Sequence, residues 1–446
     1  MPHTENWAPY VPDDKAPWDL RRVVHLHRRA GFAGTWDELQ RDLRDGPGAS
    51  IDRILAGKTS THAPAEFAAT ADLLSTSALA SGDINRLKAW WFYRMIFTPD
   101  PLGEKLTLMW HDHFATANSK VQDAALMWRQ NDALRQHARG RFDAILNASL
   151  REPALLFYLD AQTNRKGRAN ENLARELMEL FTLGVGNYSE ADVKDAARAL
   201  TGWTVEDGQF TKVLAQHDSG EKAILGQTGK WTAQNLIDML LRHPATAQRI
   251  AVKLCRLFFG ERAIDPEAVR DLGSDLREHD LDVGRTVEKI LRSRLFFADA
   301  NIATRVSGPA EFIAGTVRAL GLFDPAPSTL ALADWSARMG QDLFDPPNVG
   351  GWPSGRAWVH TRSLIARSNF ATALMAGRDA GLPSPYNPAS LPGSCGLGTG
   401  QADLLTFYHR LLFGTDPTES ARSRLNGVSG SRLVAVLLSS PEGQLG

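Results

Sequence analysis

The sequence predicts an all-α protein, a multi-helix globular bundle with at most a small β-hairpin near residues 203–215. Apolar side chains recur at the spacing of a helix through most of the 446 residues. The alternation of apolar and polar residues that is typical of strands is confined to Val205 and residues 210–214. Because strands do not alternate with helices along the chain, a parallel sheet is not expected.

Local signals place the ends of several helices. Thr35 followed by Glu38 forms a capping box that begins a helix. The Pro-Asp-Pro segment 99–101 ends one helix and lets the next begin, and Pro244 suits the first turn of another. Residues 64–81, rich in Ala, Ser and Thr, are compatible with either helix or loop. We expect further helices at residues 49–56, 84–97, 102–113, 121–137, 141–148, 153–159, 170–184, 190–200, 232–241, 244–259, 266–277, 283–292, 309–320 and 330–340.

Composition divides the chain into four segments. Residues 1–24 read as an N-terminal arm, and residues 25–378 form the main helical domain. Residues 379–400 are a Pro/Gly-rich linker or loop, because they carry four prolines and five glycines. Residues 401–446 form a small C-terminal helical unit that we expect to pack on the main domain.

The charge balance gives no sign of a polyanionic partner at the level of the whole chain. Fifty basic side chains face 51 acidic ones, for a formal net charge of −1. No global field therefore attracts nucleic acid or an anionic membrane, and we expect neither as a partner. The two cysteines, Cys255 and Cys395, do not form a disulfide framework.

Localisation is inferred from what the sequence does not show. No apolar segment of a secretory signal is visible near the start, and no apolar run approaches the roughly 18 residues of a membrane span. We expect a soluble cytoplasmic protein, or a periplasmic or secreted one if a signal was trimmed.

Two histidines lie two residues apart in the segment 110–113, Trp-His-Asp-His. On a helix, this spacing points the rings about 200° apart, so both can bind one metal ion only if the helix has unwound by Phe114. The alternative packs one ring against the tryptophans of the 84–97 helix and leaves the other exposed. We take His111 and His113 as candidate ligands of a divalent metal ion.

Polar side chains share one side of the predicted 170–184 helix. Glu176 and Glu179 are three residues apart, and Asn172 joins them. Paired carboxylates can bind a hard divalent cation or exchange protons, whereas a solvated charged face is the plain alternative. Arg175 would neutralise a carboxylate or hold an anionic group of the substrate.

A short polar segment at residues 216–222 combines an imidazole, a carboxylate, an amine and a turn glycine. His217 is a fourth candidate metal ligand, Asp218 a candidate base or its orienting partner, and Lys222 a candidate anion contact. The alternative is an ordinary polar turn. Signatures of nucleotide-binding loops, zinc proteases and serine hydrolases are absent.

Residues 345–353, here called the Trp-Pro loop, read Asp-Pro-Pro-Asn-Val-Gly-Gly-Trp-Pro, and Trp358 follows them. Rigid prolines, permissive glycines and Trp352 make an aromatic-walled loop that could stack a sugar or another flat group. The alternative is a structural plug against the helical core.

These stretches occur in the order of a pattern found in one protein family. The matching segments are residues 109–114, Tyr158-Leu159-Asp160, residues 170–180, residues 197–203 ending in Trp203, His217-Asp218 with residues 222–226, and residues 339–341 through Gly351-Trp352-Pro353. The chain resembles the bacterial domain of unknown function 1800 family over roughly residues 26–375.

The resemblance implies a mainly helical fold but no activity. Members of that family are often encoded beside proteins that look like sulfatases or alkaline phosphatases, so such a protein is an expected partner. A shared pattern of His, Asp, Asn, Glu, Arg and Trp implies a polar cleft, since apolar packing does not require those types.

Two functional hypotheses follow. In the first, the protein is a metal-dependent enzyme of hydrolase type acting on a small molecule or a glycan. Its metal ligands are His111, His113, Glu176 and His217; its catalytic residues are Glu179, Asp218, Arg175 and Lys222; and its substrate contacts are Asn172, Tyr158, Asp160, Trp352 and Trp203. In the second, it is a non-enzymatic binding or scaffold module that uses the Trp-Pro loop.

Overall fold

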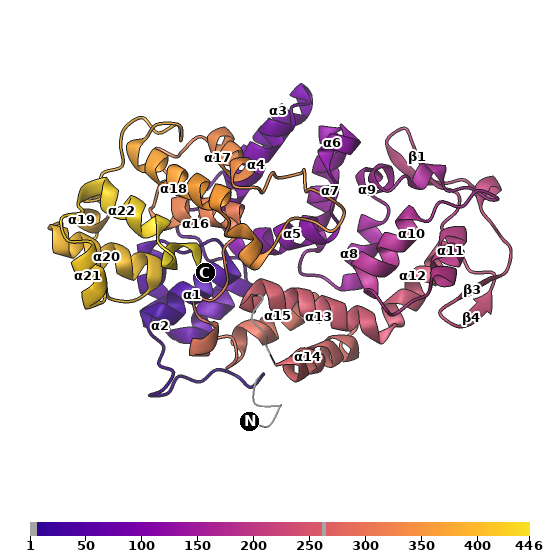
Figure 1. The fold of residues 1–446 in the computed structure, drawn as a ribbon, viewed down its shortest axis with the longest axis horizontal. Helices are drawn as coiled ribbons and strands as arrows, with labels where there is room; N and C mark the ends of the chain where they lie inside the picture. The colour runs from indigo at the N-terminus through magenta and orange to yellow at the C-terminus, as the bar shows by residue number, and fades with distance from the viewer. Residues whose placement is uncertain (1–6, 261–264) are drawn as a thin grey trace.

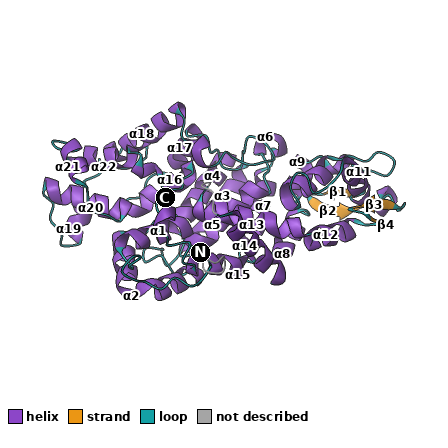
Figure 2. Ribbon diagram, turned by 60° about the horizontal axis from the view of Figure 1, so that its bottom comes forward, coloured by secondary structure: helices purple, strands orange, loops and turns teal. Residues whose placement is uncertain are grey.

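The computed structural model describes residues 7–260 and 265–446. Within these residues the protein is helical apart from two small antiparallel sheets, which confirms the predicted all-α fold. The arrangement is elongated: helices α19–α22 lie at one end, both sheets lie at the other, and α5 lies between them (Figures 1 and 2). None of the described helices is long and apolar enough to cross a membrane.

The first part of the chain forms helices α1 to α9. The capping box of Thr35 and Glu38 begins α2 as predicted, and Asp100 caps α5 with Pro101 in its first turn. The segment for which helix and loop were both left open is a helix from Phe67. The bounds are α1 Leu20–Ala30, α2 Trp36–Leu55, α3 Phe67–Ser81, α4 Ile84–Phe97, α5 Pro101–His113, α6 Asn118–Val121, α7 Ala124–His137, α8 Phe142–Ser149 and α9 Pro153–Tyr158.

The predicted 170–184 helix is present but changes its winding part-way. Helix α10 spans Asn172–Glu176, and a π-helical turn continues it over Leu177–Thr182. A π turn is rare and recurs at functional sites, because it redirects backbone carbonyls. Gly184, whose φ of 83° suits glycine, ends the segment.

The predicted hairpin pairs β1 with β2, with Trp203 opposite Lys212. A second hairpin, β3 with β4, follows directly and was not predicted from the sequence. The bounds are α11 Glu190–Ala199, β1 Trp203–Glu206, β2 Gln209–Lys212, β3 Lys222–Ile224, β4 Gln227–Gly229, α12 Ala233–Arg242, α13 Pro244–Phe259, α14 Pro266–Glu278 and α15 Val283–Arg292. The last helices are α16 Pro309–Ala319, α17 Thr329–Arg338, α18 Thr361–Ala376, α19 Ser390–Ser394, α20 Gln401–Phe413, α21 Glu419–Arg424 and α22 Gly430–Ser439.

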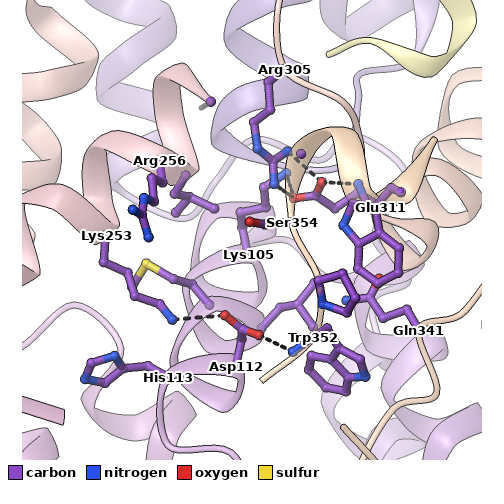
Figure 3. A pocket seen from close by; sticks show the side chains of 18 of the residues that line it. Lys105, Asp112, His113, Lys253, Arg256, Arg305, Glu311, Gln341, Trp352 and Ser354 are labelled. Atoms are coloured by element: carbon purple, nitrogen blue, oxygen red, sulfur yellow. Dashed lines mark hydrogen bonds and ion pairs between the residues drawn. The ribbon is translucent and has the colours of Figure 1, made fainter. Parts of the chain in front are cut away.

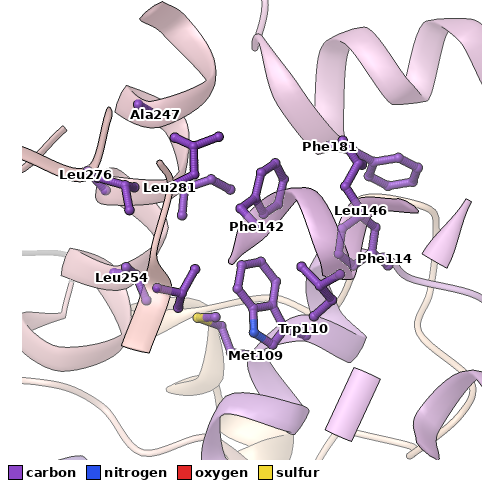
Figure 4. Close-up of a cluster of buried hydrophobic side chains, with 14 of the residues drawn as sticks. Met109, Trp110, Phe114, Phe142, Leu146, Phe181, Ala247, Leu254, Leu276 and Leu281 are labelled. Carbon is purple, nitrogen blue, oxygen red and sulfur yellow. The ribbon is translucent and has the colours of Figure 1, made fainter. Parts of the chain in front are cut away.

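Two apolar cores lie side by side, and the second also takes in helices of the predicted C-terminal unit. One is built mainly by α5, α8, α10–α15 and the π turn, and Trp110, Phe114, Phe142 and Phe181 lie together in it (Figure 4). The other is built by α3, α4, α16–α18, α20 and α22. Helix α5 contributes to both, Met109 to the first and Leu108 to the second. The junction of the two cores therefore lies along α5.

The terminal segments pack on these cores. The described part of the N-terminal arm donates a hydrogen bond from Trp7 Nε1 to the Ala268 carbonyl at 3.0 Å, and Tyr10 packs on Phe297. Residues 1–6 of that arm lie outside the described residues. At the other end, α22 packs on α18, and α20 contacts α1.

Candidate functional site

A pocket of about 280 Å³ opens where the two cores meet. We call it the α5–α13 pocket. Its walls are one face of α5, one face of α13, the start of α16 and the segment from the end of the Trp-Pro loop to Trp358 (Figure 3). Such a hollow at the junction of two packed units is a usual place for a ligand site. Its charged and aromatic lining residues include Lys105, Asp112, His113, Arg249, Lys253, Arg256, Arg305, Glu311, Trp352 and Trp358.

Helical spacing brings the polar groups of each wall together. Lys105, Met109 and Asp112 recur at every third or fourth position of α5, and Arg249, Lys253 and Arg256 do the same on α13. Residues at these spacings share one face of a helix, so each helix presents a single polar edge to the pocket.

Asp112 holds α13 and the Trp-Pro loop together at the centre of the pocket (Figure 3). Its Oδ2 lies 2.9 Å from Lys253 Nζ, and its Oδ1 accepts the backbone N–H of Trp352 at 2.8 Å. Gly351 has a φ of 90°, and a Cβ there would overlap the Asp112 carboxylate. The glycine that precedes Trp352 is therefore required by this close approach.

The second carboxylate, Glu311, is buried among cations. Its oxygens lie 2.6 and 3.0 Å from the Arg305 guanidinium, and Lys105 Nζ lies 2.6 Å away. Burial alone would raise the pKa of Glu311, but Arg305 and Lys105 lower it well below its usual range. Burial lowers the pKa of Lys105 to about 8, against the opposing effect of Glu311.

Basic side chains outnumber carboxylates in this pocket. Among the described residues, Lys105, Arg249, Lys253, Arg256 and Arg305 line it, whereas Asp112 and Glu311 are the two acids. Both acids are already paired with cations. Arg249 and Arg256 form no ion pair with any described residue, so the surplus positive charge lies on the α13 side.

The π turn after α10 positions two groups of this pocket. The Leu180 carbonyl accepts Arg249 Nε at 2.6 Å, and the Phe181 carbonyl accepts His113 Nε2 at 3.2 Å. Because a carbonyl can only accept, Nε2 carries the proton. Burial, with the nearby Lys253 and Arg249, lowers the pKa of His113 well below its usual value, so its Nδ1 is unprotonated at neutral pH.

His111 faces away from His113, because α5 continues through both residues. Its ring is fully buried between Trp91, Phe344 and Trp352, with ring centroids 5.0–5.6 Å apart. Neither ring nitrogen has a hydrogen-bond partner among the described residues. Burial lowers the pKa of His111 to about 3. The predicted alternative is right in packing one ring against a tryptophan of the 84–97 helix, because His111 lies against Trp91, but wrong in leaving the other ring exposed, because His113 is also buried.

The other two predicted metal ligands lie elsewhere. Glu176 is half-buried, and burial together with Glu179 raises its pKa. His217 Nδ1 lies 3.1 Å from the Thr201 carbonyl. Among the described residues, no group of three or more His, Cys, Asp or Glu side chains is placed to hold a metal ion. The arrangement therefore does not fit the prediction that His111, His113, Glu176 and His217 share one ion.

Several predicted substrate contacts form a separate cluster outside the α5–α13 pocket. Asn172 Nδ2 lies 3.3 Å from Asp160 Oδ2, and Lys120 pairs with Asp160 at 2.9 Å. Burial raises the pKa of Tyr158, and the nearby Asp345 and Glu176 raise it further. This cluster joins three segments of the family pattern, but none of its members lines the pocket.

The remaining predicted catalytic residues make local contacts. Arg175 pairs with Glu190 at 2.8 Å and with Glu171 at 3.0 Å, and Glu179 accepts the Tyr188 hydroxyl at 2.7 Å.

Beside the hairpins, Asp218 pairs with Arg198 at 2.7 Å. Lys222 donates to the carbonyls of Asp218 and Gly220 at 2.6 and 2.9 Å. Trp203 packs edge-on against Phe210. Residues 216–222 thus form a turn held by local hydrogen bonds, which is compatible with the alternative of an ordinary polar turn.

Of the predicted site residues, His113 and Trp352 line the pocket. Asp112 was not among the predicted site residues, although it lies between the two histidines. The cations of α13 were not predicted either, although their signal is present: basic residues at positions 249, 253 and 256 recur at helical spacing.

A comparison with protein families matches residues 25–445 to a family described as "Protein of unknown function (DUF1800)". The chain belongs to the DUF1800 family. The family resemblance seen in the sequence is thereby confirmed for nearly the whole chain. No curated protein and no solved structure matches this DUF1800 protein.

Proposed function

We propose that this DUF1800 protein binds a small organic anion in the α5–α13 pocket. One observation carries the proposal: among the described lining residues, five basic side chains stand against two carboxylates, and both carboxylates are already paired. Arg249 and Arg256 are left without an ion pair to any described residue. A partly enclosed cleft with surplus positive charge concentrates anions, and guanidinium groups bind carboxylate, sulfate and phosphate in a bidentate manner.

The pocket suits an organic anion better than an inorganic one. Leu108, Met109 and Leu257 line it together with Trp352 and Trp358. These apolar groups would contact a carbon skeleton, whereas a bare phosphate or sulfate would leave them unused. The Trp-Pro loop thus takes part in binding, in agreement with the binding-module hypothesis.

The metal-dependent hydrolase predicted from the sequence draws no support from this arrangement. Its ligands do not converge among the described residues, and Arg175, Asp218 and Lys222 are engaged in contacts outside the pocket. Of the metal ligands that the sequence hypothesis named, His113 alone is among the described residues that line the pocket. Binding is therefore the function that we propose.

Isothermal titration calorimetry tests this proposal. The ligands are galacturonate and N-acetylglucosamine 6-sulfate, whose amide nitrogen carries no charge, with galactose as the uncharged reference. The charged sugars should bind the wild-type protein, and Arg256→Gln should weaken that binding by about 10- to 100-fold, the effect of losing one charge-assisted hydrogen bond. The control is Arg424→Gln, an exposed arginine on α21 that lines neither this pocket nor its surroundings.

Two results would overturn the proposal. One is binding of galactose as tight as that of the charged sugars, because the cations would then contribute nothing. The other is an affinity for the charged sugars that Arg256→Gln leaves unchanged or that Arg424→Gln lowers equally.

A further inference from the structure

A second hollow, of about 550 Å³, adjoins the α5–α13 pocket along α13. We call it the α13–α14 groove. Arg249, Val252 and Arg256 line both hollows, so the two share the exposed edge of α13. The rest of the groove comes from α14, from the residues before and at the start of α13, and from Leu183 and Asn187 after the π turn.

The charge of the groove is of one sign. Arg249, Arg256, Arg270 and Arg277 line it, and no aspartate or glutamate is among its described lining residues. Arg270 pairs with Glu267 at 3.3 Å, one helical turn away. Arg277 is exposed and forms no ion pair with any described residue. A second anionic group is thus favoured here for the same electrostatic reason as in the pocket.

The spacing of the cations exceeds the size of one anionic group. Arg249 and Arg256 are seven residues apart on α13, which is about 10.5 Å along a helix axis. Helix α14 packs beside α13, with Gly273 against Gln248, and so adds Arg270 and Arg277 to the same side (Figure 1). A single carboxylate, sulfate or phosphate contacts only one end of this row.

We propose that the pocket and the groove together bind one acidic oligosaccharide, with one charged sugar in the pocket and the next in the groove. This inference rests on the proposed function and names the ligand class. An inorganic polyphosphate would satisfy the arginines but leave the apolar lining of the pocket unused. A single-stranded nucleic acid would need exposed aromatic platforms, whereas Trp352 and Trp358 are only 7% and 5% exposed.

The test compares chain length within two classes of acidic sugar. Tri-galacturonate is titrated beside galacturonate, a heparin tetrasaccharide is titrated beside N-acetylglucosamine 6-sulfate as a single sulfated sugar, and tripolyphosphate is the inorganic reference. Both oligomers should bind the wild-type protein at least about tenfold more tightly than their monomers, because a second linked site adds avidity. The Arg270→Gln/Arg277→Gln double variant should remove this gain, so that it binds an oligomer no more tightly than a monomer, while Arg424→Gln should keep the full gain.

The outcomes separate the two proposals. If the monomers bind through Arg256 but neither oligomer binds more tightly than its monomer, the proposal of an oligosaccharide ligand is overturned. The proposal that the pocket binds a small organic anion then still stands. An oligomer gain that survives in the double variant would overturn the groove as the second site. Tight binding of tripolyphosphate, without a gain in affinity for either oligosaccharide, would overturn the proposal that the ligand has a carbon skeleton. Absence of binding by every charged sugar would overturn both proposals.

Discussion

The carboxylate of Asp112 accepts the backbone N–H of Trp352 at 2.8 Å, and this contact fastens a loop of residues 345–353 to a helix 240 positions earlier in the chain. The same carboxylate holds Lys253 at 2.9 Å. Three segments therefore depend on one side chain. Substitutions of Asp112 can separate the contribution of its negative charge from that of its hydrogen bond to Trp352.

Asp112→Asn should keep an acceptor for Trp352 but release Lys253 from its ion pair. We expect tighter binding of galacturonate, because the pocket loses one of its two negative charges, and a stability loss of about 1 kcal/mol or less for a partly exposed pair. Asp112→Ala should also free the loop and cost about 1–3 kcal/mol. Urea unfolding and calorimetry measure the two effects. Weaker anion binding by Asp112→Asn would contradict the expectation.

Gly351→Ala should destabilise the protein. The substitution places a Cβ against the Asp112 carboxylate at a backbone φ of 90°, so the loop must shift or strain. A loss of roughly 1–3 kcal/mol in urea unfolding is expected. The control is Gly48→Ala in α2, where a Cβ meets nothing within 4 Å; it should be neutral or slightly stabilising. Equal effects at the two sites would show that the close approach does not matter.

These relationships show which parts of the structure the sequence could predict. Capping at Thr35 and the turn at residues 99–101 depend on neighbouring residues, so local patterns placed those helix ends correctly. The burial of His111 depends on Trp91, Phe344 and Trp352, which are remote along the chain. No local pattern carries that information. A histidine that packs in an apolar core and a histidine that binds a metal ion can therefore lie in the same local sequence.

The pocket was missed for a related reason. Its cations come from α13, from Lys105 of α5 and from Arg305, whereas the cations predicted from the sequence, Arg175 and Lys222, do not line it. The α10 segment was expected to carry the site, but its contribution is indirect: the carbonyls of its π turn orient Arg249 and His113. A π turn has no recognised sequence signal, so the deviation from a plain helix was not predictable.

Glu311→Gln should be among the most destabilising substitutions in the pocket. It leaves Lys105 and Arg305 without their buried carboxylate, and removing one partner of a buried ionic cluster costs roughly 3–5 kcal/mol. Urea unfolding at pH 7 measures this loss. Glu288→Gln, which removes an exposed partner of Arg292, is the matched control and should cost at most about 1 kcal/mol. A loss at Glu311 no larger than the control would refute the burial argument.

Stability should fall as the pH drops below about 6.5, in part because of His111. Its pKa is about 3 in the folded protein and near 6.5 when unfolded, so between these values the unfolded chain binds the extra proton. Each such histidine then costs about 1.4 kcal/mol per pH unit below 6.5, or roughly 2 kcal/mol at pH 5, and the loss levels off below pH 3. His113 and His25, whose pKa values burial also lowers, act in the same direction.

Urea unfolding of His111→Phe at pH 7 and pH 5 tests this prediction. The free energy of unfolding should differ less between the two pH values than it does in the wild type, because the phenyl ring can pack among the same aromatic groups but cannot bind a proton. If the variant keeps the full wild-type difference, His111 is not the proton acceptor and the pH dependence must come from the other buried histidines.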